Sequence, residues 1–196
     1  MTSKQKKILI RTGVTLLVAL AGFVFYGDSG TFFNTDKKPT KENLGASALD
    51  SINQDQFYKV YKVVDGDTVS IEVDGAVATV RLIGVNTPET VDPRREVECF
   101  GREASDFAKS ILTGKSVKLE FDPTQSKVDR YDRLLAYVST EEGVDVNKIL
   151  ILEGYAYEYT YEKPYGRQEE FRMAQVSAQI ANKGLWNPAT CDGKRH

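Results

Sequence analysis

Residues 63–89 read VVDGDTVSIEVDGAVATVRLIGVNTPE, and this stretch decides the predicted fold. Its apolar residues are mostly β-branched and roughly alternate with polar ones, a pattern typical of strands with one buried face. Asp65-Gly66 and Asp74-Gly75 interrupt the pattern, and Asp-Gly favours a hairpin turn because it tolerates positive φ. The stretch and the residues before it therefore predict a three-stranded meander, with strands at 57–64, 68–73 and 77–85.

The residues that follow predict further helices and strands. One apolar helical stripe, ended by Gly114, consists of Ala104, Phe107, Ala108, Ile111 and Leu112. Alternation predicts strands at 117–121 and 134–138, and apolar spacing predicts helices near 146–150 and 171–181. The expected class is mainly β with helices (α+β), as a five-stranded OB-fold barrel with three helices. A different five-stranded α+β sheet fits the same order of elements.

The chain begins with a basic segment followed by an apolar one. Four Lys and Arg residues lie within residues 1–11, and residues 12–25 carry no charge. This order is typical of an export signal or an N-terminal membrane anchor, although a buried core helix is an alternative. The expected organisation is a signal peptide or anchor at 1–27, a flexible linker at 28–56, a globular domain at 57–188 and a tail at 189–196. The protein is then extracellular or at the cell surface, and cleavage of the segment stays open.

Charge and composition narrow the possible chemistry. The formal net charge is -2, so any site for a polyanion has to be local. The only histidine is His196, and Cys99 and Cys191 are the only cysteines, which excludes a Cys/His zinc cluster. In an exported protein two cysteines usually pair, so we expect a Cys99–Cys191 disulfide. Catalysis would have to use carboxylates, arginine and a hard metal.

The central stretch contains such residues. Asp65, Asp67 and Glu89 lie in polar loops on either side of an apolar strand that carries Arg81. If the strands pair as predicted, both loops come to one end of a small sheet. Carboxylates that bind a hard cation, next to an arginine fork, are suited to phosphate chemistry. The plainer interpretation is that the aspartates belong to a hairpin turn and that the segment around Pro88 is another turn.

Five short motifs in register make the chain similar to the staphylococcal nuclease (thermonuclease) family, from about residue 60 to residue 186. They are Asp65-Gly66-Asp67-Thr68, RLIGV at 81–85, Thr87-Pro88-Glu89-Thr90, Gly101-Arg102-Glu103-Ala104 and YDRLLAY at 131–137. The resemblance implies an OB barrel with three helices and calcium-dependent hydrolysis of phosphodiester bonds in DNA and RNA, leaving 3′-phosphate ends. The implied partners are single-stranded or locally opened nucleic acid and, if the N-terminal segment is uncleaved, a membrane; the protein is expected to be a monomer.

The resemblance also assigns roles to individual residues. Glu89 matches the proposed general base, and Arg81 and Arg133 match the arginines that bind the scissile phosphate. Asp67 and the backbone carbonyl of Thr87 match calcium ligands, and Asp65 matches an acid that supports the water shell of the metal. Asn86 stands where the family has a second carboxylate ligand. Its amide oxygen can still bind calcium, but without charge, so we expect weaker metal binding or a changed metal preference.

Aromatic and basic residues extend the candidate site. Tyrosines alternate at 155, 157, 159 and 161, and the resemblance places Tyr159 and Tyr161 near nucleotide-binding tyrosines, although Glu162 looks like an insertion that blurs the match. Stacking on aromatic rings suits sequence-tolerant binding of single strands; the alternative is a strand-like segment that packs one tyrosine face on the domain. Arg130 and Tyr131 are the other candidate substrate-binding residues. Arg94, Arg95 and Lys127 would add local positive charge or form ordinary surface.

Three functions compete on these residues. The first is an exported or membrane-tethered nuclease, favoured by the joint presence of Arg81, Glu89 and Arg133. The second is a catalytically weakened OB-fold module that binds nucleic acid, for which Asn86 is the indication. The third is a structural protein whose partner is another protein.

Overall fold

The computed structural model describes residues 45–90 and 97–194. The predicted signal or anchor at 1–27, Arg94, Arg95 and His196 lie outside these residues. Within the described ranges, no helix combines the length and the apolar character needed to cross a membrane.

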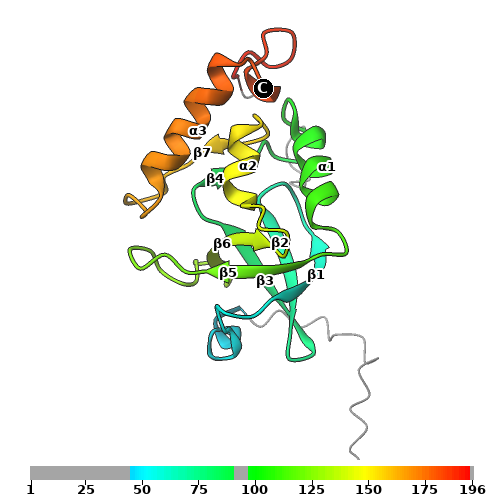
Figure 1. Ribbon diagram of the computed structural model, residues 1–196, viewed down its shortest axis with the longest axis vertical. Helices are drawn as coiled ribbons and strands as arrows, with labels where there is room; N and C mark the ends of the chain where they lie inside the picture. Colours follow the sequence, from blue (N-terminus) through cyan, green and yellow to red (C-terminus); the bar gives the residue numbers. More distant parts are fainter. Residues whose placement is uncertain (1–44, 91–96, 195–196) are drawn as a thin grey trace, which may run out of the picture. The chain divides into compact units, whose positions relative to one another are not determined.

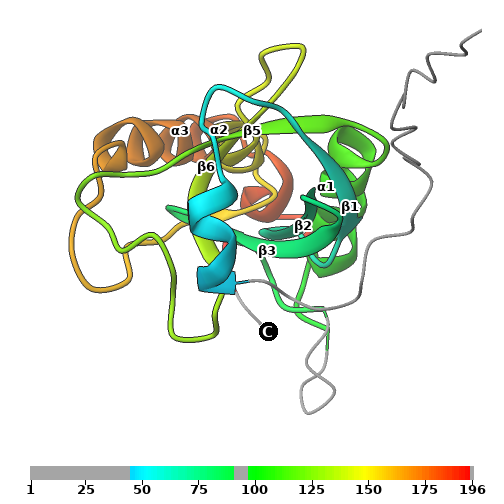
Figure 2. The same ribbon diagram turned by 90° about the horizontal axis from the view of Figure 1, so that it is seen from below.

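Five strands close into a barrel in the order β1-β2-β3-β6-β5, which confirms the predicted barrel over the alternative sheet. The strands are β1 (Tyr58–Val63), β2 (Thr68–Val73), β3 (Ala76–Leu82), β5 (Ser116–Glu120) and β6 (Leu134–Thr140). All neighbours are antiparallel except β3 and β6, which pair in parallel. Figure 2 shows the strands curving around a common centre.

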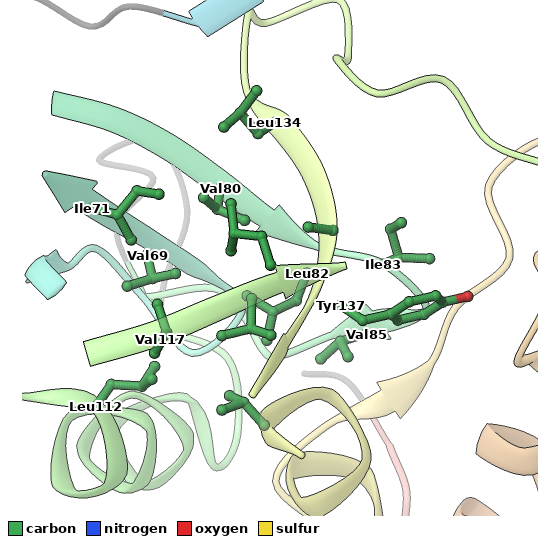
Figure 3. Close-up of a cluster of buried hydrophobic side chains, with 14 of the residues drawn as sticks. Val69, Ile71, Val80, Leu82, Ile83, Val85, Leu112, Val117, Leu134 and Tyr137 are labelled. Atoms are coloured by element: carbon green, nitrogen blue, oxygen red, sulfur yellow. The ribbon is translucent and has the colours of Figure 1, made fainter. Parts of the chain in front are cut away.

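The alternating side chains of these strands fill the barrel (Figure 3). Among the fully buried residues at its centre are Val69, Ile71, Val80, Val117 and Leu134. Burying a side chain of this size contributes about 1.5–3 kcal/mol, so a short β-branched strand becomes stable once its neighbours close around it. The barrel is therefore a rigid base for the loops at its ends.

The prediction of one strand at 77–85 is wrong, because the structure has two strands there. β3 ends at Leu82, and after a break at Ile83 and Gly84 the chain enters β4 (Val85–Asn86), which pairs with β7 (Tyr157–Glu158) outside the barrel. Gly84 has φ +75°, and a Cβ there would lie 2.5 Å from Tyr165 and 2.7 Å from Phe171. A glycine thus turns the chain out of the barrel sheet and into β4, where Val85 still packs in the core and Asn86 is partly exposed.

The structure has the three predicted helices, and they lie together on one side of the barrel (Figure 1). They are α1 (Gly101–Leu112), α2 (Val146–Leu152) and α3 (Gln168–Ile180), with a short 3-10 turn, η2 (Gly184–Trp186), after α3. The predicted stripe of α1 is buried at Ala104, Ala108 and Leu112. The side chain of Asp145 caps α2 by accepting a hydrogen bond from the backbone N–H of Lys148 at 3.0 Å.

The folded part begins before the predicted domain boundary at residue 57, and its C-terminal end is held by the predicted disulfide. A 3-10 helix, η1 (Gly45–Ser51), occupies the last part of the expected linker, with Ala48 fully buried in the core. The backbone N–H of Ala46 donates to Asp132 Oδ1 at 2.7 Å, so a carboxylate from a distant loop holds the start of η1. At the other end, the expected tail is joined to the domain through Cys191.

Candidate active site

An ion pair joins the first hairpin to the third strand. β2 and β3 pair Thr68 with Arg81, so the guanidinium of Arg81 lies beside the preceding residue, Asp67. Arg81 Nη2 is 3.0 Å from Asp67 Oδ2, and both side chains are largely buried. Arg81 Nη1 also donates to the carbonyl oxygens of Leu82 and Val85 at 3.0 and 2.7 Å. The partner that a buried arginine needs is therefore Asp67, and the guanidinium is held in one orientation.

Asp67 also holds the next loop. Its Oδ2 accepts a hydrogen bond from the backbone N–H of Thr87 at 2.9 Å, across 20 residues of sequence. The Thr87 side chain packs so closely on Gly66 that a Cβ there would come within 2.5 Å of it. The two loops of the central stretch thus meet at one end of the barrel, as the sequence predicted.

Asp65 adds a second carboxylate to this end of the barrel. Its Oδ1 accepts a hydrogen bond from the backbone N–H of Asp67 at 3.2 Å. Burial, together with the negative charge of Asp67, raises the pKa of Asp65 to about 7. A buried carboxylate beside a second one indicates a place where a bound cation would be favourable.

A groove of about 630 Å³ opens beside the ion pair. Seven of the residues singled out from the sequence line it: Arg81, Asn86, Arg130, Tyr131, Arg133, Tyr159 and Tyr161. Arg133 is held by Asp129, whose Oδ2 lies 2.8 Å from Nε and 2.6 Å from Nη2. The groove thus brings together two arginines, each oriented by an aspartate.

Exposed aromatic rings also line this groove. Tyr131 and Tyr161 are each about 60% exposed, and their rings flank Arg130, whose guanidinium lies 4.9 and 6.0 Å from the two ring centres. The alternating tyrosines divide: Tyr157 is buried against Trp186, whereas Tyr159 and Tyr161 face the groove. Rings of this kind are available for stacking with bases.

Glu89 lies two residues beyond Thr87, at the start of another loop. It does not line the groove, and neither do Asp65, Asp67 and Thr87. Its backbone carbonyl accepts from the N–H of Glu98 at 3.0 Å, and its own N–H donates to Glu98 Oε2 at 3.1 Å. The predicted site is therefore not a single enclosed pocket. It consists of the groove that Arg81 and Arg133 line, the end of the barrel that carries Asp65 and Asp67, which we call the acidic end, and Glu89 beyond Thr87.

Cys99 and Cys191 form the predicted disulfide, with their Cα atoms 5.9 Å apart. Of the predicted surface cations, Arg130 lines the groove, while the ammonium group of Lys127 lies 5.3 Å above the Phe121 ring.

The sequence reasoning missed Asn147, which connects the site to the helices. It is fully buried on α2; its Nδ2 donates to the carbonyl of Ile83 at 2.8 Å, and its Oδ1 accepts from the N–H of Val138 at 2.9 Å. Asn147 thereby holds the break between β3 and β4. The sequence contained one signal of this burial. Asn147 lies three and four residues before Leu150 and Ile151, which places it on the same apolar face of the helix.

Comparisons with known proteins show the family of this chain. A family model described as staphylococcal nuclease homologue matches residues 79–188. The chain belongs to the staphylococcal nuclease family. It is 41% identical to the thermonuclease of Staphylococcus hyicus over 79% of this chain and 87% of that protein. It is 36% identical to the thermonuclease of Staphylococcus intermedius over 90% of this chain and 97% of that protein.

A third relative in the family comes from a prophage. The SPbeta prophage-derived endonuclease YokF of Bacillus subtilis (strain 168) is 35% identical over 64% of this chain and 42% of that protein. The family model covers Arg81, Asn86, Thr87, Glu89 and Arg133, whereas Asp65 and Asp67 precede the matched residues.

Proposed function

We propose that this protein is a metal-dependent nuclease that hydrolyses phosphodiester bonds in DNA and RNA with broad specificity and leaves 3′-phosphate ends. The observation that carries the proposal is the Asp67–Arg81 pair, because it connects the acidic end of the barrel to a groove that Arg133 also lines. The names of the two thermonucleases and of the prophage endonuclease support the same activity.

The groove suits a nucleic-acid strand. Each guanidinium presents a planar fork that matches two phosphate oxygens and stays charged. Arg81 and Arg133 would bind the scissile phosphate and stabilise the charge that develops in its five-coordinate transition state, where most of the rate enhancement arises. Arg130, Tyr131, Tyr159 and Tyr161 would bind the flanking nucleotide through stacking, which tolerates any base.

The oxygen donors of the acidic end fit a hard divalent cation such as Ca²⁺. Asp67 and Asp65 supply carboxylates, Asn86 an amide oxygen and Thr87 a backbone carbonyl. The fit is supported by the raised pKa of Asp65, about 7, which burial and, second to it, the negative charge of Asp67 produce. Within residues 45–90 and 97–194, no three Asp, Glu, His or Cys side chains form a metal-binding group, so the charge on the ligands would be low. When bound, the cation would screen the phosphate and orient water.

Glu89 would act as the general base. Its carboxylate accepts the proton of the attacking water, while the arginines hold the phosphate for in-line displacement of the leaving oxygen. With no histidine before the last residue, a carboxylate is the natural base.

We also propose that the protein is exported and acts as a monomer outside the cell or at its surface, held by its N-terminal segment if that segment is uncleaved. The basic start, the apolar run that follows it and the Cys99–Cys191 disulfide support export.

Cleavage assays on the full chain test the proposal. DNA and RNA are incubated with Ca²⁺ or with chelator, and the ends are identified with a phosphatase. We expect cleavage with Ca²⁺ only, 3′-phosphate ends, and a fall in kcat of roughly 100-fold or more in Glu89→Gln. Equal activity in wild type and Glu89→Gln would remove Glu89 from the mechanism.

Asn86 keeps a second function open: an OB-fold module that binds nucleic acid but hardly cleaves it. The amide brings no charge to a position where a carboxylate would hold the metal more tightly. Binding of single-stranded DNA without cleavage at saturating Ca²⁺ would favour this alternative.

A further inference from the structure

We propose that Glu98 is a positioning residue for Glu89, and that the Cys99–Cys191 disulfide holds Glu98 in place. The inference rests on the proposed function, because it concerns the proposed general base. It assigns a role to a carboxylate and a disulfide that lie outside the groove and outside the acidic end of the barrel.

The first observation is that Glu98 binds both backbone polar groups of Glu89. Its N–H donates to the Glu89 carbonyl at 3.0 Å, and its carboxylate accepts from the Glu89 N–H at 3.1 Å. The side chain of Glu89 in turn accepts from the N–H of Thr90 at 2.8 Å. Since two bonds to one residue determine the orientation of a peptide, Glu98 sets the direction in which the Glu89 carboxylate leaves the chain.

The second observation is the close contact between α1 and the same segment. A Cβ on Gly101, the first residue of α1, would lie 3.1 Å from the Glu89 carbonyl, 3.4 Å from the Pro88 carbonyl and 2.7 Å from Thr90 Cγ2. Only a residue without a side chain allows the helix to approach this far. The Glu89 segment is therefore pressed against the start of α1, three residues after Glu98.

The third observation is the anchor beside Glu98. Cys99 is joined to Cys191, which is buried in a second apolar cluster. The cluster consists of Tyr157, Leu185 and Cys191, with Cys99, Phe100 and Trp186 packed against it. The Phe100 ring also stacks on Tyr155 at 5.5 Å. The residues that flank the contact with Glu89 are thus connected to the C-terminal part of the chain.

The same cluster supports the other side of the site. Tyr157 belongs to β7 and pairs with Asn86 of β4, and its ring packs edge-on against Trp186 at 5.3 Å. The C-terminal cluster therefore holds Asn86 through strand pairing and Glu89 through Glu98. Because a displacement of about 1 Å of a reacting group can cost on the order of 100-fold in rate, loosening this cluster is expected to lower activity without unfolding the barrel.

The test compares Glu98→Ala and Glu98→Gln in the full, oxidised chain. Alanine removes the acceptor, whereas glutamine keeps an oxygen acceptor without the charge. We expect kcat to fall roughly ten- to hundred-fold in the alanine variant with KM nearly unchanged, and to be restored in large part by glutamine. Hydrogen exchange followed by mass spectrometry should show loss of protection at the Glu89 amide in Glu98→Ala but not in Glu98→Gln.

Two further variants sharpen the test. Asp106→Ala removes an exposed carboxylate from α1 and should leave kcat and Glu89 exchange as in wild type. The paired variant Cys99→Ser with Cys191→Ser should lower kcat and Glu89 protection in the direction of Glu98→Ala. In a Glu89→Gln background, Glu98→Ala should lower kcat no further, because its effect acts through Glu89.

Each contrary result overturns the inference. Unchanged kcat and unchanged Glu89 protection in Glu98→Ala would do so, and so would a glutamine variant as impaired as alanine, or a loss confined to KM. If the wild type itself does not cleave nucleic acid, the proposed function fails; the exchange measurement then still decides whether Glu98 orders Glu89.

Discussion

Two hairpins of the barrel share the dipeptide Asp-Gly but differ in the residues that contact it. Asp74 and Gly75 join β2 to β3 with φ of 49° and 80°, and no atom lies within 4 Å of a Cβ built on Gly75. Asp65 and Gly66 join β1 to β2, where Gly66 contacts Thr87 and the following Asp67 is only 6% exposed. The Asp74-Gly75 hairpin is a turn and little more, whereas the Asp65-Gly66 hairpin is part of the candidate site.

The difference shows that local turn chemistry does not distinguish the two. Both dipeptides tolerate positive φ, and both were predicted as turns for that reason. What separates them is the partner that the barrel brings to each: solvent for Asp74, and Arg81 and Thr87 for the hairpin of Asp65. The same substitution made at both hairpins therefore separates the effect of lost tertiary contacts from the effect of a changed turn residue.

The largest effect is expected from Asp67→Asn, with Asp74→Asn as its control. Removing the charge of Asp67 leaves the buried Arg81 guanidinium without its counter-charge, which costs about 3 kcal/mol in the free energy of unfolding. We also expect kcat to fall about 100-fold, because Asp67 orients Arg81 and is a proposed metal ligand. Urea unfolding and cleavage assays measure both; Asp74→Asn should change stability by less than about 0.5 kcal/mol. Equal effects at the two sites would refute the comparison.

The next effect separates Gly66→Ala from Gly75→Ala. A Cβ on Gly66 would collide with Thr87 at 2.5 Å, so we expect the Thr87 loop to shift and kcat to fall roughly tenfold or more. At Gly75 the space is open but φ is +80°, so alanine should cost about 1 kcal/mol of stability and leave kcat unchanged. An active Gly66→Ala variant would show that the Thr87 loop does not have to be placed tightly.

A moderate effect is expected from Asn86→Asp. The new carboxylate adds a charged ligand at the acidic end of the barrel, so the Ca²⁺ concentration for half-maximal cleavage should fall, by about tenfold. Titration of activity against Ca²⁺ measures this. An unchanged or higher requirement would show that Asn86 is not a metal ligand.

The smallest effect concerns pH and distinguishes Asp65 from Asp74. The pKa of Asp65 is raised from 3.8 to about 7 in the folded protein, so the stability contributed by the bound proton is fully present below pH 4 and is lost as the pH rises through 7. In chelator, Asp65→Asn should therefore raise Tm by about 2–4 °C at pH 8 and leave it unchanged at pH 4. Asp74→Asn should show no such difference, and a gain for Asp65→Asn that is equal at both pH values would contradict the assignment.

Most strands and helices follow from local pattern, and the departures have physical causes. The strand predicted at 77–85 is divided because a side chain at Gly84 would collide with Tyr165 and Phe171, which are 81 and 87 residues away. The last part of the linker predicted at 28–56 contains the helix η1, whose start Asp132 holds. Both departures depend on contacts between residues distant in sequence, which periodicity does not reveal.

The sequence by itself determined most of the strands, the three helices, the cysteine pair and the set of polar residues available for chemistry, because hydrophobic period and turn residues act over short distances. The tertiary structure decided that the five strands close into a barrel rather than form another sheet. Only the tertiary structure decided which of these residues meet. It paired Arg81 with Asp67, brought Arg81 and Arg133 to one groove, left the acidic end beside that groove, and placed Glu98 against Glu89. A hydrogen bond or ion pair between distant residues forms only after the barrel has closed and excluded water from it, so no short stretch of the chain contains it.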